Sequence, residues 1–121
     1  MSTSPPPPPP PLAAAVMLVD RAERECTARG DRATSDLDDL ATWHLDANVV
    51  RIAAETLRSA TAVPLPELAV FEPAAGLDPL ELLRAAQDEL QEVPDDLANV
   101  ALFLGRLRMS DALSAVRSHY E

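Results

Sequence analysis

The residues of this sequence best suited to chemistry are two histidines and one cysteine. His44 is the stronger candidate for a general base or a metal ligand, and either role needs a second ionisable group nearby. On a helix that neighbour would stand four residues away, where the chain has Leu40 and Asn48. We therefore predict that His44 is a boundary residue on a solvated strip and that His119 is a surface residue.

Cys26 and the acidic cluster at Asp36, Asp38 and Asp39 do not form a reactive site either. A nucleophilic thiol needs a basic setting, whereas Cys26 falls on an apolar helix face with acidic neighbours. A calcium loop needs a glycine at its sharp turn, and carboxylates at a helix start are explained by the helix dipole. We predict no catalytic residue, no metal ligand and no cofactor, so the chain is not expected to be an enzyme.

One alternative retains a role for His44. In an enzyme or a small-ligand site, His44 would line a helical pocket together with a carboxylate from another helix, because a general base needs an orienting partner. A fully solvated His44 would exclude this alternative.

The net charge of −10 sets limits on the partners. General binding to nucleic acid or to an anionic membrane would need a basic surface. The longest uninterrupted apolar run, 12–19, is far shorter than the roughly 20 residues that cross a membrane. A single cysteine forms no intramolecular disulfide, which favours a reducing compartment. These features predict a cytoplasmic protein.

Alanine and leucine dominate the apolar residues and favour helix, whereas strand formers are scarce. We predict an all-α fold, a small bundle of four to five helices in a single domain over 12–121. Residues 5–11 are consecutive prolines, and we expect 1–11 to be a disordered polyproline tail. The predicted helices cover 12–29, 36–60, 79–92, 95–108 and 110–120.

Capping signals place the helix ends. Gly30 is predicted to cap the first helix, Ser35 the second and Asp78 the third. If the fourth helix continued in phase it would turn Asp111 toward the core, so we predict a change of register at Ser110. In the second helix, four further apolar residues widen the buried stripe and predict packing on two sides. These four are Leu45, Val49, Ile52 and Ala53. The inner face of the fourth helix is predicted to hold Leu97, Val100, Ala101, Leu104 and Leu107.

The acidic residues are concentrated between Val63 and Pro94, where seven acids accompany a single base, Arg84. A face of this kind steers a basic partner toward it. We predict a non-catalytic protein that binds another protein, as an adaptor, a chaperone, an inhibitor or antitoxin-like neutraliser, or a small accessory subunit. A core with few aromatic residues is thin, and a dimer interface would add to it, so a homodimer is a further alternative. The predicted binding residues are Glu67, Leu68, Phe71, Glu72, Asp88, Glu89 and Glu92.

The run 107–120 resembles a helix-turn-helix recognition segment, with a serine cap at Ser110 followed by a short helix ending in Tyr120. This resemblance implies an alternative function, a small DNA-binding regulator that uses 97–120. Phosphates would then be met by Arg106, Arg108, Arg117 and His119. Asp111 would repel phosphate at the start of the reading helix, and lysine is absent, so we expect nucleic acid to be the less favoured partner.

Overall fold

The computed structural model describes residues 10–33, 36–61, 77–94 and 98–120, and these residues form helices without any strand. The polyproline tail predicted for 1–11 lies almost entirely outside the described residues, as does the segment 62–76. The prediction of an all-α bundle is confirmed. The elements are α1 (Pro11–Arg32), α2 (Leu37–Ala60), α4 (Pro79–Gln91), α5 (Val100–Arg117) and a terminal 3₁₀ turn, η2 (Ser118–Tyr120).

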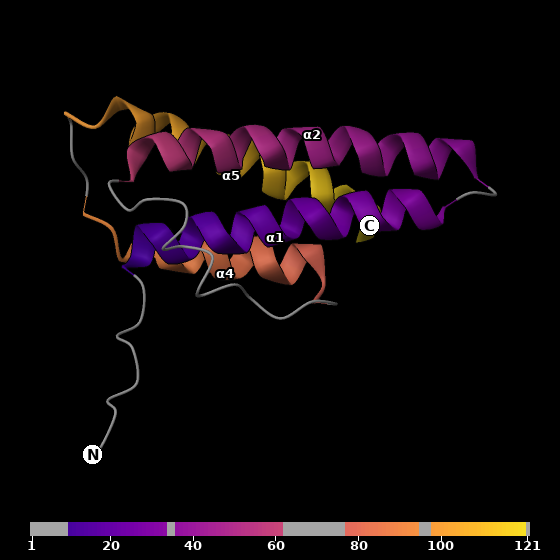
Figure 1. Cartoon of the computed structure of the whole chain (residues 1–121), viewed down its shortest axis with the longest axis horizontal. Helices are drawn as coiled ribbons and strands as arrows, with labels where there is room; N and C mark the ends of the chain where they lie inside the picture. Colours follow the sequence, from indigo (N-terminus) through magenta and orange to yellow (C-terminus); the bar gives the residue numbers. More distant parts are fainter. Residues whose placement is uncertain (1–9, 34–35, 62–76, 95–97, 121) are drawn as a thin grey trace, which may run out of the picture.

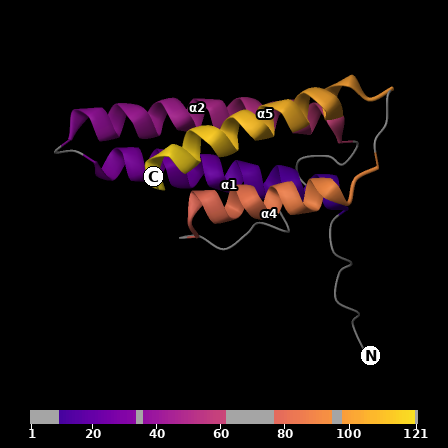
Figure 2. The same ribbon diagram turned by 180° about the vertical axis from the view of Figure 1, so that it is seen from behind.

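The helices α1 and α2 form an antiparallel pair that carries the other two (Figure 1). Helix α4 packs along α1, and α5 packs on α2, as the view from behind shows (Figure 2). Arg58 near the end of α2 pairs with Asp20 of α1. The terminal turn η2, which follows α5, contacts α2 through the pair of His119 and Asp46. This arrangement brings residues far apart in sequence to one end of the molecule.

Side-chain caps explain three of the helix starts, and that of α5 is Asn99, whose side-chain oxygen accepts the N–H of Leu102. The carboxylate of Asp36 accepts the backbone N–H groups of Asp38 and Asp39 at the start of α2, and Asp78 accepts the N–H of Leu80 at the start of α4. The prediction for Asp78 is confirmed, whereas the cap of α2 is Asp36. The predicted cap, Ser35, lies outside the described residues.

The two described glycines sit where helices approach each other closely. A Cβ atom at Gly30 would lie 2.9 Å from the imidazole Cδ2 of His44, and one at Gly105 would lie 2.5 Å from Leu57 Cδ2. The prediction that Gly30 caps α1 is wrong, because α1 continues through it to Arg32. Its missing side chain instead makes room for the ring of His44.

The core lies between the inner faces of all four helices. On α1, α2 and α4 the predicted apolar positions are mostly buried, for example Val19, Leu57 and Leu83. The prediction that α2 packs on two sides is confirmed, because α2 contacts both α1 and α5. Of the four residues predicted to widen its buried stripe, Ala53 is buried and Val49 is partly buried, whereas Leu45 is 64 % exposed and Ile52 is also exposed.

The two helices predicted after residue 95 are one helix, α5, which runs without a break through Ser110. Its register also differs from the prediction, because the helix buries its face of smaller residues. Val100, Leu104 and Leu107 are exposed, and Leu97 lies outside the described residues. The buried residues of α5 are Leu102, Gly105, Met109, Ala112 and Val116.

This register follows from the close contact of α5 with α2. Gly105 packs directly against Leu57, so larger side chains at that position would separate the helices. Turned this way, the helix also places Asp111 in solvent without any change of register. The turn needed by the helix-turn-helix alternative is therefore not present within residues 98–120.

Candidate functional site

Three of the predicted binding residues lie on α4. Asp88 is exposed and Glu89 is half-buried, while Glu92 is exposed at the end of the helix. The remaining predicted residues, Glu67, Leu68, Phe71 and Glu72, lie outside the described residues. The described part of the predicted site is thus an acidic edge on α4.

The largest exposed apolar feature of the described chain is on α5. Phe103 is 62 % exposed and Leu107 is 50 % exposed, and Val100 and Leu104 are exposed with them. Their spacing of three and four residues puts these four side chains on one side of the helix. We call Val100, Phe103, Leu104 and Leu107 the α5 stripe. Val100, Leu104 and Leu107 were predicted to share one helix face, but that face was predicted to lie in the core.

A groove of about 380 Å³ adjoins the α5 stripe between α5 and α2. Its α2 wall contains Val49 and Ile52, and its α5 wall contains Arg108, whose guanidinium lies 3.6 Å from the carboxylate of Asp111. Leu104 precedes Arg108 by one helical turn on the same side of α5. The α2 wall of this groove is therefore apolar, whereas its α5 wall is mostly polar.

The end of α4 contacts α5 close to the stripe. Arg106 of α5 donates from Nη2 to the carbonyl oxygen of Val93 over 2.8 Å. Glu92 precedes Val93 in the chain, and Phe103 stands three residues before Arg106 on the same side of α5. The end of α4 that carries Glu92 therefore contacts α5 one turn from Phe103, and the Arg108–Asp111 pair lies further along α5.

A second cluster forms where the terminal turn meets α2. The His119 ring stacks on Trp43, with the ring centroids 3.7 Å apart and the planes 8° from parallel. His119 Nε2 pairs with the Asp46 carboxylate, and the His119 side chain is only 9 % exposed. The prediction of a surface histidine is therefore wrong. Burial raises the pKa of Asp46, and this effect outweighs the opposing effect of the bond to His119.

Asp78, the cap of α4, contacts Tyr120, the residue that follows His119 in the terminal turn. Its carboxylate accepts a hydrogen bond of 2.7 Å from the Tyr120 hydroxyl and lies 3.6 Å from Arg29 of α1. Burial alone would raise the pKa of Asp78, but the bonds from Tyr120 and Leu80 and the charge of Arg29 bring it below its usual range. Burial and the bond to Asp78 raise the pKa of Tyr120 to about 12.

The other candidates for chemistry are placed in unreactive settings. Burial and the nearby charge of Asp46 raise the pKa of the Cys26 thiol to about 12, so it is not a thiolate near neutral pH. A carboxylate from another helix does reach His44, since Asp31 Oδ1 of α1 lies 3.3 Å from its Nε2; the His44 side chain is 39 % exposed and that of Asp31 is 67 % exposed. Within the described ranges no group of three or more His, Cys, Asp or Glu side chains could hold a metal ion.

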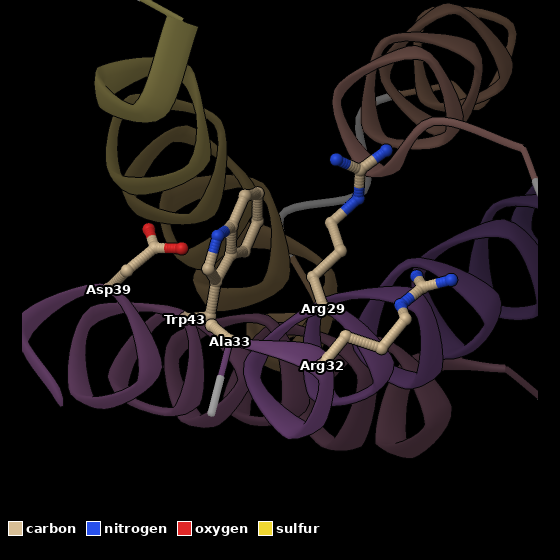
Figure 3. Close-up of a pocket in the computed structure, with 5 residues that line it drawn as sticks. All are labelled: Arg29, Arg32, Ala33, Asp39 and Trp43. Carbon is tan, nitrogen blue, oxygen red and sulfur yellow. The ribbon is translucent and has the colours of Figure 1, made fainter. Parts of the chain in front are cut away.

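A shallow hollow of about 430 Å³ opens beside Trp43 at the α1–α2 end of the bundle. Arg29 and Arg32 line one side of it, and the indole of Trp43 and the carboxylate of Asp39 line the other (Figure 3). The guanidinium carbon of Arg29 lies 5.4 Å from the centroid of the Trp43 ring. Charges of both signs face this hollow, which therefore favours neither an anion nor a cation.

No family model, no curated protein and no solved structure matches this chain. Among the residues that the structure describes, no helix is both long and apolar enough to cross a membrane.

Proposed function

We propose that this chain is a non-catalytic protein that binds another protein, and that the α5 stripe is the apolar part of its binding surface. The partner is a protein segment with apolar side chains flanked by basic residues. The acidic edge of α4, with Asp88, Glu89 and Glu92, attracts those basic residues. The proposal includes further acidic and apolar contacts from four residues outside the described ranges, Glu67, Leu68, Phe71 and Glu72.

The main support for this proposal is the exposure of the α5 stripe. Four large apolar side chains on one side of a helix, more than 40 % exposed each, are costly to leave in water. Contiguous apolar patches on small proteins commonly mark interaction sites. Burying such side chains stabilises a complex by about 25 cal/mol per Å² of apolar area. The buried face of α5 already satisfies the core, so these residues are free to contact a partner.

The charge of the molecule determines the chemistry of that partner. The chain carries a net charge of −10, and the carboxylates of Asp88 and Glu92 at the end of α4 are exposed. A basic partner is attracted by this field, and an acidic one is repelled. The same field opposes a second copy of this chain, because both copies would bring equal negative charge to the contact. The specific role as adaptor, chaperone, inhibitor or accessory subunit follows from the partner.

The test measures affinity for a partner purified from native cell extract. Phe103→Ser with Leu107→Ser should weaken binding by about tenfold or more, which corresponds to roughly 1.4 kcal/mol. The control is Leu37→Ser, because Leu37 is an exposed leucine at the far end of α2. It should leave affinity unchanged. Both variants should retain the wild-type melting temperature, since exposed substitutions change stability by only about 0.5 kcal/mol.

Two results would contradict the proposal. One is equal affinity of the wild type and the Phe103→Ser, Leu107→Ser variant for the purified partner. The other is concentration-dependent dimerisation of the wild type in sedimentation that the double variant abolishes, because the stripe would then be covered by a second copy.

A further inference from the structure

The His119 side chain is buried against the first half of α2, whereas its neighbours Ser118 and Tyr120 are exposed. Tyr120 is 45 % exposed. The His119 ring lies flat on Trp43 with its Nε2 paired to Asp46. The turn is thus fixed to the bundle by a stacked ring, the contact of His119 Nε2 with the Asp46 carboxylate and the bond from Tyr120 to Asp78.

Trp43 and Asp46 together have the features of a receptor for a flat cation. They stand three residues apart on α2, so both side chains project from the same side of the helix. An indole face attracts a cation placed over it, and a carboxylate at the edge accepts its hydrogen bonds. A guanidinium group suits this pair well, because it stacks on aromatic rings and binds carboxylates through its planar fork.

We propose that Trp43 and Asp46 form an acceptor site for a planar cationic side chain of the partner, an arginine or a histidine, and that His119 occupies this site as an intramolecular plug. This inference rests on the proposed function, which requires a basic partner. It adds a second contact at the opposite end of α5 from Val100 and Phe103. The partner must displace the turn before it can use this contact.

The acceptor site of Trp43 and Asp46 can take a cation in addition to Arg29, because the charge of Arg29 is paired with Asp78. Arg29 is the cation already near Trp43, and Asp78 lies 3.6 Å from its guanidinium. The Asp46 carboxylate pairs with His119 across 73 residues of sequence. Removing His119 therefore leaves Asp46 without this partner beside an uncovered indole face. Because a tethered plug acts at a high effective concentration, a free cation competes poorly until the plug is removed.

The experiment removes the plug and supplies the cation as a small molecule. In His119→Ala, imidazole and N-acetyl-arginine amide should each bind saturably, which is read from the emission of Trp43, the single tryptophan of the chain. N-acetyl-citrulline amide, the neutral counterpart of the arginine probe, should bind about tenfold more weakly or not at all. The wild type should bind the arginine probe about tenfold more weakly than His119→Ala does.

Two further variants separate the site from nonspecific binding. Adding Asp46→Asn to His119→Ala should abolish the preference for arginine over citrulline. His44→Ala is the matched control, because His44 neighbours Trp43 in the chain but pairs with Asp31, and it should behave as the wild type. The proposal is overturned if His119→Ala binds none of the probes, if citrulline binds as well as arginine, or if Asp46→Asn changes nothing.

A measurement on the intact chain covers the case in which His119→Ala does not fold. Stacking on Trp43 shifts the ring proton resonances of His119, and excess N-acetyl-arginine amide should move them toward those of a free histidine. The resonances of His44 should not move. Unchanged His119 resonances at saturating probe would also overturn the proposal. The probes do not involve Phe103 or Leu107, so their failure would leave the proposed function of the α5 stripe untouched.

Discussion

Cys26 and Tyr120 each keep their proton to unusually high pH because of where the fold places them. The pKa of both groups is raised to about 12, mainly by burial. In the unfolded chain these groups ionise near their ordinary values of 9.0 and 10.0. Between pH 9 and 12 the unfolded state therefore binds fewer protons than the folded state, and stability falls as pH rises.

This difference predicts the alkaline behaviour of the protein. The stabilisation is complete below pH 9 and is lost as the pH approaches 12, so urea midpoints should decrease steadily above pH 9. Tyr120→Phe and Cys26→Ala should each flatten that decrease, although the second also lowers stability at all pH values by leaving a small cavity. An identical slope in the wild type and both variants would contradict the raised pKa of the thiol and of the phenol.

The two helix-contact glycines predict opposite effects of alanine. At Gly105 a new Cβ would meet buried Leu57 at 2.5 Å, and overpacking of this kind costs roughly 1–3 kcal/mol. At Gly30 the new atom would meet the partly exposed ring of His44, which can rotate outward. Replacing a glycine inside a helix with alanine then gains up to about 1 kcal/mol.

Urea unfolding of Gly105→Ala and Gly30→Ala checks this contrast directly. Gly105→Ala should unfold at lower urea than the wild type, and Gly30→Ala at the same or higher urea. If both substitutions destabilised equally, the distinction between a core contact and a movable surface ring would be wrong.

The helix starts show how capping joins local structure to tertiary contacts. The carboxylate of Asp36 caps α2 through two backbone N–H groups of the first turn, so its contacts are local. Asp78 caps α4 and also accepts from Tyr120 and pairs with Arg29. The two caps are therefore chemically alike but differ in how many elements they join.

Alanine substitution should separate these contributions. Asp36→Ala should cost about 1 kcal/mol, the usual value for a lost cap, and Asp78→Ala should cost more because three contacts are lost. Asp78→Asn keeps the cap, since asparagine caps as well as aspartate, and should recover part of that difference. Thermal unfolding of the three variants measures it, and equal losses for Asp36→Ala and Asp78→Ala would contradict the tertiary role of Asp78.

The buried face of a helix could be predicted from the sequence where the helix has a single apolar face. Helix α4 has one, and its predicted face of Leu80, Leu83, Ala86 and Leu90 is buried. Helix α5 has two, and periodicity favoured the face with larger side chains. The choice depends on how closely α5 approaches Leu57 at Gly105, which is a tertiary property.

The candidate site was predictable only in part for a similar reason. The acidic residues of α4 were identified from local charge density, which needs no tertiary information. The contact of His119 with Asp46 spans 73 residues, and neither residue has a local partner that indicates it. The α5 stripe was visible in the sequence as an apolar face, but its exposure follows from the register chosen by Gly105.

The position of the acidic residues, and not only the net charge of the molecule, should determine how fast the partner associates. Reversing Asp88, Glu89 and Glu92 to arginine raises the net charge from −10 to −4 and removes the acidic edge of α4. If a local field steers the partner, the association rate should fall severalfold and depend less on salt. The dissociation rate should change less, because exposed charges at the edge of an interface act mainly on encounter.

The matched control reverses Asp31, Asp38 and Asp39 at the α1–α2 end and reaches the same net charge. These residues lie near the first turn of α2, at the far end of the bundle from Phe103. Stopped-flow association with the purified partner at several salt concentrations compares the two triple variants. A larger loss for the α4 reversal places the encounter surface beside the α5 stripe. Equal losses would show that total charge governs the encounter, and the assignment of the α4 edge would then be wrong.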